Sequence, residues 1–340
     1  MAHKMKVAII GCGGIAHVHA KSLKLIFDVE LVACCDIDYK KAKDFAQLYD
    51  IDLVYDSFEQ VLQNKEIDAV HICTPHYLHA KMICDALKNG VHVFSEKPPV
   101  INSEQLLMID ECVAKYCNNE SAPHFAVCFQ NRFKPSVEFV KNEIEKQMSD
   151  EGAKDIILGI RAFVTWRRDE DYYKTDWKGK LETEGGGVLI NQSIHTLDLI
   201  QYFMGAKTKP DEVIGTISNF HLKDKIEVED SVMAYLLYKN ARANFFATNA
   251  YCKDAPPIIE VVTKNTCYLV EENSVKITKN GEVEIKQFVE DECFGKAYWG
   301  TTHKKAIELF YKSVKSNTAY ELDFCNVRQS VENMLKIYKR

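Results

Sequence analysis

The sequence predicts an α/β domain with a doubly wound parallel sheet, followed by an α+β domain with a mostly antiparallel open sheet. Short apolar runs alternate with helical patterns over the first 128 residues, which is typical of parallel strands joined by crossover helices. After about residue 130, strand follows strand with few helices between them. At 340 residues the chain is long enough for two domains, and we expect them at 1–128 and 129–340.

Short apolar runs in the first domain predict the strands of its sheet. Runs of this length, bounded by polar segments, are typical of buried strands, and the segments between them are long enough to be helices. The predicted strands are Val7–Ile10, Glu30–Cys35, Ala69–Cys73, Val91–Phe94 and Phe125–Phe129.

The second domain contains strand-like runs separated by turn-forming residues such as Lys239–Asn240 and the Lys-Asn-Gly of 279–281. The predicted strands are 156–166, 212–221, 231–238, 242–250, 258–263 and 267–271, and two helices are expected at 296–315 and 325–338.

Composition and charge exclude several classes of protein. The net charge is -6 and Lys and Arg do not cluster, which argues against a nucleic-acid partner. The longest apolar stretch near the N-terminus is four residues, too short for a signal peptide, and nothing approaches the ~20 apolar residues of a membrane helix. The 12 cysteines match no zinc spacing. We expect a cytoplasmic protein with reduced thiols and no metal.

A glycine-rich loop follows the first predicted strand. GCGGIA at residues 11–16 fits the pattern G-x-G-x-x-A, and an amphipathic helix follows it. A glycine at position 11 permits a tight turn, one at position 13 lets the backbone approach a pyrophosphate, and an alanine at 16 lets helix and strand pack closely. The pattern predicts a Rossmann domain with dinucleotide contacts at Gly11, Gly13, Gly14, Ile15 and Ala16. An unrelated strand-turn-helix is the alternative.

Asp36 ends the second predicted strand, 22 residues after Gly14. A carboxylate at this position accepts hydrogen bonds from both ribose hydroxyls and repels a 2′-phosphate, so it favours NAD over NADP. Lys40 and Lys41 follow closely and weaken the preference, since either could reach a phosphate.

Two further stretches lie where parallel strands end, which is where open α/β sheets bind ligands. ICTPHYLH covers residues 72–79, and FSEKPP covers 94–99. Lys97 lies between Glu96 and two prolines, so a stiff loop aims its side chain. The alternative is a solvated Glu-Lys pair that only ends a strand.

The segment GGGVLINQSIHTLD, residues 185–198, predicts a buried helix that carries polar residues on one side. At 100° per residue, Asn191, His195, Asp198 and Tyr202 fall within about a 60° stripe. A solvated stripe would carry Lys, Glu or Arg, and this one has none. His195 is either part of an internal hydrogen-bond network or a residue that works on a ligand.

Together these motifs resemble the glucose–fructose oxidoreductase and inositol dehydrogenase family, often written Gfo/Idh/MocA. The resemblance spans nearly the whole chain and is carried by GCGGIA, Asp36, CTP with His79 downstream, EKP at 96–98, GGG at 185–187 with His195 beyond, and YWGTTH at 298–303.

The resemblance implies NAD-dependent or, with less support from the residues, NADP-dependent oxidation of a sugar, cyclitol or related secondary alcohol, in a homodimer or homotetramer formed through the C-terminal sheet. It adds Thr74, Pro75, His79, Glu96 and Lys97 to the expected cofactor contacts, and it implies a cis Lys97–Pro98 peptide bond. Lys97, His195 and Asn191 are the expected catalytic residues. The expected substrate contacts are Lys97, Arg132, Trp166, Tyr173, Asn191 and His195, with Arg167, Tyr172 and His303 as further candidates.

Asn191 departs from the family pattern, which has an aspartate at that position, four residues before the histidine. An amide donates and accepts hydrogen bonds but carries no charge, so a relay of three titratable residues is in question. We expect the substrate hydroxyl to meet Lys97 and His195, one of which takes its proton while hydride leaves for the nicotinamide.

Three other functions fit parts of the pattern. They are a nucleotide-sugar dehydrogenase, a glycosidase that uses bound NAD for a transient oxidation, and a non-catalytic NAD-binding regulator. Retention of both Lys97 and His195 argues against the regulator, because a sensor needs no proton acceptor.

Overall fold

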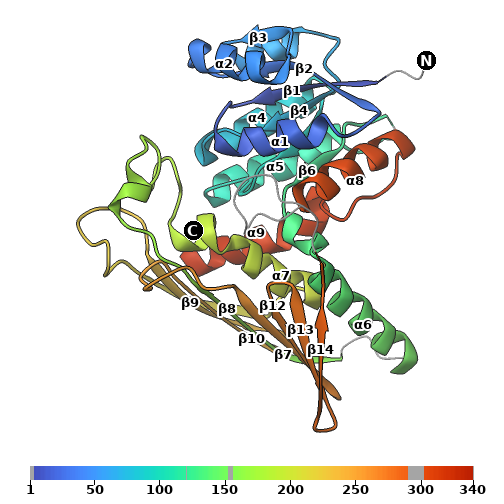
Figure 1. Ribbon diagram of the computed structural model, residues 1–340, viewed down its shortest axis with the longest axis vertical. Helices are drawn as coiled ribbons and strands as arrows, with labels where there is room; N and C mark the ends of the chain where they lie inside the picture. Colours follow the sequence, from blue (N-terminus) through green and yellow to red (C-terminus); the bar gives the residue numbers. More distant parts are fainter. Residues whose placement is uncertain (1–3, 120, 152–155, 290–301, 340) are drawn as a thin grey trace. The chain divides into compact units, whose positions relative to one another are not determined.

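The computed structural model describes residues 4–119, 121–151, 156–289 and 302–339 (Figure 1). The described residues form two compact units, the first from 4–130 and 302–324 and the second from 131–289 and 325–339. The sequence-based boundary assigned everything after residue 128 to one domain, whereas helix α8 (Thr302–Ser316) packs on α1 (Gly14–Leu23) within the first unit.

The first unit is built on a six-stranded parallel sheet in the order β3-β2-β1-β4-β5-β6. Its strands are β1 (Met5–Ile10), β2 (Val29–Cys35), β3 (Leu53–Tyr55), β4 (Ala69–Ile72), β5 (His92–Ser95) and β6 (Phe125–Val127). Its other helices are α2 (Tyr39–Tyr49), α3 (Phe58–Gln63), α4 (His76–Lys88) and α5 (Ser103–Tyr116). The predicted Rossmann-type α/β fold is confirmed.

The strand order places the predicted motifs at one edge of this sheet. β1 and β4 are neighbours and the chain winds outward from them in both directions, so the sheet has its topological switch point there. The glycine loop follows β1, Thr74 and Pro75 follow β4, and Glu96 and Lys97 follow β5. All three segments therefore lie at the carboxyl edge of the parallel sheet, where such folds bind ligands.

The second unit contains an eight-stranded sheet in the order β14-β13-β12-β11-β7-β10-β9-β8, in which only β7 and β10 pair in parallel. The strands are β7 (Ile157–Thr165), β8 (Glu212–Ser218), β9 (Ser231–Leu237), β10 (Arg242–Thr248), β11 (Ile258–Thr263), β12 (Thr266–Glu271), β13 (Ser274–Lys279) and β14 (Glu282–Gln287). The predicted mostly antiparallel sheet is confirmed, with β13 and β14 as additions. Asn280 and Gly281, both with positive φ, form the two-residue turn that joins them.

Helices cover one face of the second sheet. They are α6 (Pro135–Glu151), α7 (Ile194–Met204) and α9 (Phe324–Tyr338), which confirms the helix predicted at 325–338. Of the helix predicted at 296–315, residues 302–315 are helical and 296–301 lie outside the described residues.

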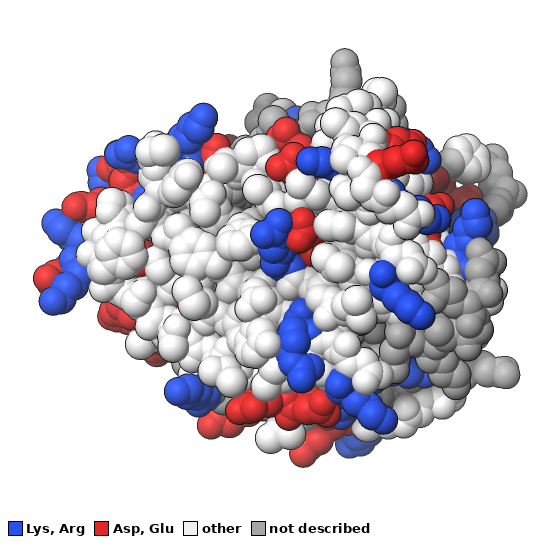
Figure 2. Space-filling model, turned by 90° about the horizontal axis from the view of Figure 1, so that it is seen from below, with Lys and Arg blue, Asp and Glu red and all other residues white. Residues whose placement is uncertain are grey.

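The opposite face of the second sheet carries large apolar side chains in the open. Side chains alternate along β7 from residue 160 onward, so Ile160 and Ala162 are buried whereas Phe163 is 37% exposed. Leu158 lies at a register irregularity between β7 and β11 and is 53% exposed. Met233 on β9 is 62% exposed. Figure 2 shows a broad area of uncharged side chains here, with few charges in its middle. We call this the open sheet face.

None of the described helices combines the length and the apolar character that crossing a bilayer requires. The cysteines in the described part of the chain are all free thiols, so none of them is joined in a disulfide there.

Candidate functional site

The glycine loop is held tightly between neighbouring strands. Gly11 has φ +87°, and a Cβ there would lie 2.7 Å from the carbonyl oxygen of Cys73. Its N–H donates to the Cys35 carbonyl at 2.7 Å. Gly13 precedes the first turn of α1, where no side chain caps the helix, and Ala16 is completely buried. The loop therefore has the turn, the close packing and the helix N-terminus that a pyrophosphate site requires.

Asp36 is tied to that loop. Its carboxylate accepts the Cys12 N–H at 2.8 Å and the Asp38 N–H at 3.0 Å, and Lys41 Nζ lies 3.0 Å from it. Lys41 therefore pairs with Asp36, while the backbone N–H groups of Lys40 and Lys41 cap α2 on Asp38. A hollow beside the loop is lined by Cys12, His17, Asp38, Lys40, Lys41, Asp44, Phe45 and Leu48.

Glu96 and Lys97 occupy different surroundings after β5. Glu96 is 7% exposed, and its carboxylate accepts a hydrogen bond from His19 Nε2 at 2.9 Å, with His303 Nε2 at 3.7 Å. Although burial opposes ionisation, these two histidines hold the pKa of Glu96 well below its usual range. Lys97 is only partly buried, and the Lys97–Pro98 peptide bond is cis, which confirms the expectation. The loop buries its carboxylate and leaves the lysine partly accessible.

A chain of buried hydrogen bonds runs from Glu96 into the domain. His19 Nδ1 and His71 Nδ1 are 2.7 Å apart, and His71 Nε2 lies 2.7 Å from the hydroxyl of Tyr311. Burial lowers the pKa of His71 well below its usual value. With both imidazoles neutral, every bond is satisfied when Tyr311 donates to His71, His71 to His19, and His19 to Glu96. This arrangement keeps Glu96 anionic and fixed.

His19 and Glu96 also belong to a group of four buried side chains whose atoms are of the kinds that bind metal ions. The ligand atoms of His19, Glu96, Cys128 and His303 all lie within 4.8 Å of one another and are buried. Nitrogen and oxygen ligands of one tetrahedral zinc ion stand about 3.3 Å apart. The 2.9 Å separation of His19 Nε2 and Glu96 Oε1 is that of a direct hydrogen bond. A metal-free protein stays a prediction.

His79 fastens the EKP loop to the neighbouring loop. Its Nδ1 lies 2.7 Å from the Pro98 carbonyl and its Nε2 lies 2.8 Å from the Thr74 carbonyl, and the ring is 1% exposed. Burial lowers the pKa of His79, although its hydrogen bonds to the Pro98 and Thr74 carbonyls oppose the shift. Both ring nitrogens face backbone carbonyls, so the geometry favours a structural role for His79 over a direct cofactor contact.

In the second unit, the GGG segment is packed against the chain itself. A Cβ on Gly187 would overlap the Glu229 carbonyl, and one on Gly186 would overlap the Tyr338 hydroxyl. The Gly187 and Leu189 N–H groups donate to the Glu229 carboxylate at 2.9 and 3.0 Å. The glycines therefore permit close approach by another segment.

The predicted helix of residues 188–204 is interrupted. Val188–Gln192 form a π-helical turn, and α7 begins at Ile194. A projection at 100° per residue does not apply across this break, so the predicted stripe is divided. Asp198 points into a buried ion pair, whereas Asn191 and His195 are partly exposed. π-turns of this kind are frequent at functional sites.

Asn191 belongs to a polar cluster that also includes residues the sequence did not indicate. Its Nδ2 donates to the Glu184 carboxylate at 2.5 Å and to the Tyr172 hydroxyl at 3.3 Å. Gln192 Nε2 donates to the same hydroxyl at 3.0 Å, and Asn249 Nδ2 donates to the Tyr173 hydroxyl at 3.1 Å and to Gln192 Oε1 at 3.2 Å. We call Tyr172, Tyr173, Glu184, Asn191, Gln192 and Asn249 the amide cluster.

Glu184 is the cluster's carboxylate. It is completely buried, and burial raises its pKa to about 7. No spacing rule joins Glu184 to Asn191, because the loop of glycines between them folds back. A carboxylate directly before GGG was the available indication.

Two predicted substrate residues have structural partners. Arg132 is completely buried, and it donates to the Asp198 carboxylate from Nε at 2.8 Å and from Nη2 at 2.6 Å. This geometry argues against direct substrate contact. Trp166 donates from Nε1 to the Ala255 carbonyl at 3.0 Å, and the Arg168 guanidinium lies 4.9 Å from its ring centre. His303 lies beside Glu96 in the first unit.

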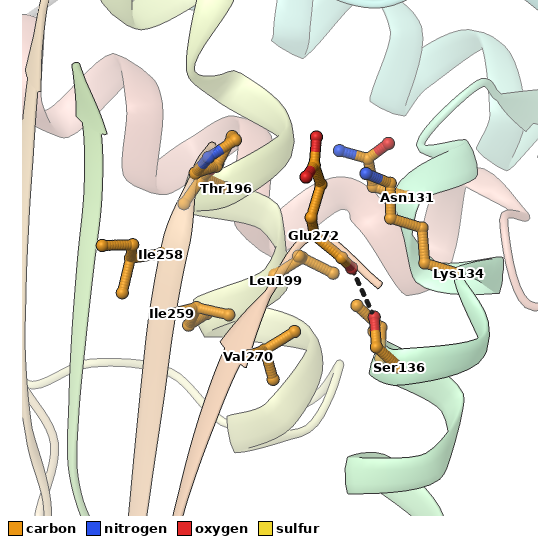
Figure 3. A pocket seen from close by; sticks show the side chains of 11 residues that line it. Asn131, Lys134, Ser136, Thr196, Leu199, Ile258, Ile259, Val270 and Glu272 are labelled. Atoms are coloured by element: carbon orange, nitrogen blue, oxygen red, sulfur yellow. Dashed lines mark hydrogen bonds between the residues drawn. The ribbon is translucent and has the colours of Figure 1, made fainter. Parts of the chain in front are cut away.

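A pocket in the second unit has a lining that includes none of the predicted site residues (Figure 3). Its wall includes Thr196 and Leu199 of α7, and the Ser136 hydroxyl donates to the Glu272 carbonyl at 3.1 Å beside it. Its volume of about 40 Å³ suits a few water molecules and is too small for a sugar.

A parallel sheet of this order, with a glycine loop after its first strand and an aspartate after its second, defines a dinucleotide-binding protein of the Rossmann class. The model of an oxidoreductase family with an NAD-binding Rossmann fold matches residues 5–119, and that of the GFO/IDH/MocA C-terminal domain matches residues 145–266. The chain belongs to the Gfo/Idh/MocA family.

Curated relatives are moderately similar in sequence. D-glucoside 3-dehydrogenase of Escherichia coli (strain K12) is 31% identical over 204 residues, which cover 59% of this chain and 54% of the relative. scyllo-Inositol 2-dehydrogenase (NAD(+)) of Bacillus subtilis (strain 168) is 27% identical over 244 residues, which cover 72% of this chain and 66% of the relative. The matches thus span about half to two thirds of these relatives.

Solved structures share the fold over the whole chain. The WlbA dehydrogenase of Chromobacterium violaceum, in complex with NADH and UDP-GlcNAcA, has a TM-score of 0.82 at 23% identity and covers 100% of this chain and 94% of its own. Levoglucosan dehydrogenase, in complex with NADH and levoglucosan, has a TM-score of 0.84 at 18% identity and covers 99% and 97%.

Proposed function

We propose that this protein is an NAD-dependent dehydrogenase that transfers hydride between NAD(H) and a secondary alcohol of a sugar, cyclitol or sugar derivative. The observation that carries the proposal is the stiff loop after β5, which buries Glu96 and leaves Lys97 partly accessible at the same sheet edge as the glycine loop. Relatives named as glucoside and inositol dehydrogenases support a polyol substrate. The amide cluster offers the hydroxyl and amide groups that recognise polyols.

NAD+ supplies the hydride acceptor when it is bound. We assign proton transfer to Lys97 and His195: one of them accepts the proton of the substrate hydroxyl as the C–H bond breaks. Both side chains are partly exposed, so each is accessible to a ligand. A base works best with a pKa near the operating pH, and a neighbouring nicotinamide cation would lower that of a lysine.

NAD is the proposed cofactor over NADP. The Asp36 carboxylate is fixed by two backbone N–H groups, so it stays in place to accept hydrogen bonds from a ribose. Lys41 is paired with that carboxylate, which leaves less positive charge for a 2′-phosphate.

The open sheet face is the proposed subunit interface of a homodimer or homotetramer. Contiguous apolar surface of this kind commonly marks a protein interface. Leu158 and Phe163 on β7 and Met233 on β9 are exposed, and β10 lies between these two strands.

The test is NADH formation with a panel of cyclitols, free sugars and nucleotide sugars, followed by Lys97→Ala and His195→Ala. We expect net reduction of NAD by the wild type and a loss of kcat of at least 10²-fold in each variant, the usual size of a general acid–base contribution. Circular dichroism and thermal unfolding serve as the folding control, because Lys97 is itself an expected cofactor contact.

The outcomes separate the competing functions. Bond hydrolysis without net NADH would mark the glycosidase, and binding of NAD without either reaction would mark the regulator. Near-wild-type rates in both variants with a turned-over substrate would refute the assignment of Lys97 and His195.

A further inference from the structure

Asn191 presents an unexplained feature of the proposed substrate site, because an amide stands where the family pattern has a carboxylate. The structure places a carboxylate on that amide from elsewhere in the chain. Glu184 Oε1 accepts from Asn191 Nδ2 at 2.5 Å, and Glu184 Oε2 accepts the Gly179 N–H at 2.5 Å. Both oxygens of Glu184 are therefore engaged inside the second unit.

We propose that Glu184 is a positioning residue for substrate recognition, and that its carboxylate fixes the Asn191 amide with Nδ2 inward and Oδ1 as the acceptor toward the substrate. This inference rests on the proposed function and names the group that orients that site. Glu184 would supply, at hydrogen-bond distance, the carboxylate that residue 191 lacks.

The orientation follows from the hydrogen-bonding capacity of each group. An ionised carboxylate only accepts, so the atom of Asn191 that faces it must be the nitrogen. The same nitrogen also faces the Tyr172 hydroxyl, so both of its hydrogens are directed into the cluster. Oδ1 is then the atom of the amide that can accept a hydrogen bond from a substrate hydroxyl.

Protonation of Glu184 would reverse this preference, because a carboxylic acid can donate to Oδ1 and let the amide turn over. Among the described residues, the charged groups that act on the carboxylate include Lys178, which favours ionisation, and Glu229, which opposes it. Burial and the charge of Glu184 raise the pKa of Tyr173. The Tyr172 hydroxyl accepts a hydrogen bond from Asn191 Nδ2, which also donates to Glu184. Ionisation of Glu184 near neutral pH would thus select the acceptor form of Asn191.

Substitutions at the two positions give distinct predictions. In Glu184→Gln, the new amide must accept from Gly179 and present its nitrogen to Asn191, so the Asn191 amide turns and presents a donor outward. In the double variant Glu184→Gln/Asn191→Asp, the introduced glutamine donates to the introduced carboxylate, which again presents an acceptor outward. Loss in the single variant and recovery in the double variant is a pattern that a merely structural Glu184 would not produce.

The experiment measures kcat and KM from pH 5.5 to 9 for the wild type, both single variants and the double variant. Glu182→Gln is the matched control, since Glu182 is exposed and lies two residues upstream. We expect Glu184→Gln to lose roughly tenfold or more in kcat/KM at pH 8, and the double variant to recover most of that loss. Wild-type-like kinetics in Glu184→Gln, or no recovery in a folded double variant, would overturn the proposal.

A second measurement does not depend on turnover. In asparagine-labelled protein, the side-chain NH2 resonances of Asn191, assigned with Asn191→Asp, should titrate in the wild type and in Glu182→Gln but stay constant in Glu184→Gln. An Asn191 amide that does not respond to pH in the wild type would refute the role of Glu184. If it responds and no substrate in the panel is oxidised, the proposed function fails and the coupling of Glu184 to Asn191 stands.

Discussion

Adjacent residues can serve opposite purposes, and Glu96 and Lys97 show how burial separates them. Glu96 is held by His19 inside the first unit, whereas Lys97 keeps part of its side chain accessible. A buried carboxylate with fixed donors anchors the loop, because moving it would leave those donors unsatisfied. The same separation occurs between buried Glu184 and partly exposed Asn191.

Glu184 should make the stability of the protein depend on pH. Its pKa is raised from 4.5 to about 7 by burial, so the folded chain binds this proton more tightly than the unfolded chain. The resulting stabilisation is complete below pH 4.5 and is lost as pH rises through about 7. The lost contribution is about 3 kcal/mol at most.

Denaturant unfolding at pH 5 and pH 8 checks this expectation. At each pH, the free energy of unfolding of the wild type is subtracted from that of Glu184→Gln. This difference should be more favourable to the variant at pH 8 than at pH 5, because glutamine does not ionise. Glu182→Gln should show no such difference. An equal offset of Glu184→Gln from the wild type at both pH values would contradict the raised pKa.

At the scale of elements, α7 is anchored by charge as well as by apolar packing. Arg132 and Asp198 are both completely buried or nearly so, and the Ser330 hydroxyl on α9 donates to the same carboxylate at 2.6 Å. Removing one partner of a buried pair leaves the other charge without compensation, which costs about 3–5 kcal/mol.

Arg132→Ala and Arg161→Ala form a matched pair of variants. Arg161 lies on the open sheet face and pairs with Glu260 at 2.6 Å, but its side chain is 59% exposed. We expect Arg132→Ala to lower the free energy of unfolding by about 3–5 kcal/mol and Arg161→Ala by about 1 kcal/mol or less. Similar losses in thermal or denaturant unfolding would show that the buried pair does not anchor α7.

The elements that sequence could predict are those whose pattern is local. Strand periodicity and the glycine loop sufficed for both sheets, whereas the apolar run of β3 is only three residues long, shorter than the runs that indicate a strand. The π-turn at 188–192 was missed because a regular helix was assumed. Glu184, Gln192 and Asn249 joined the amide cluster through tertiary folding, which no spacing in one sequence shows.

At the scale of the whole molecule, the return of α8 to the first unit and the open sheet face are the features that local patterns do not reveal. The chain leaves the first unit after residue 130 and comes back to it for 302–324. The open sheet face exposes apolar side chains that water solvates poorly, and a second copy of the chain would cover them.

Met233→Lys should weaken self-association, because it places a charge among the exposed apolar side chains of the proposed interface. Phe27→Lys is the control, since Phe27 is 84% exposed on the first unit. Light scattering after size exclusion should show a dimer or tetramer for the wild type and for Phe27→Lys, and smaller species for Met233→Lys. A wild-type monomer at micromolar concentration would contradict the proposed interface.

Hydride transfer from substrate to NAD is the central claim, and deuterium labelling tests it most directly. An accepted alcohol carrying deuterium at its carbinol carbon is incubated with the enzyme and NAD+, and the nucleotide product is examined by mass spectrometry. The proposed function predicts one deuterium in each NADH formed and a carbonyl product without it. Deuterium that stays in the sugar product, with no net NADH, would contradict it.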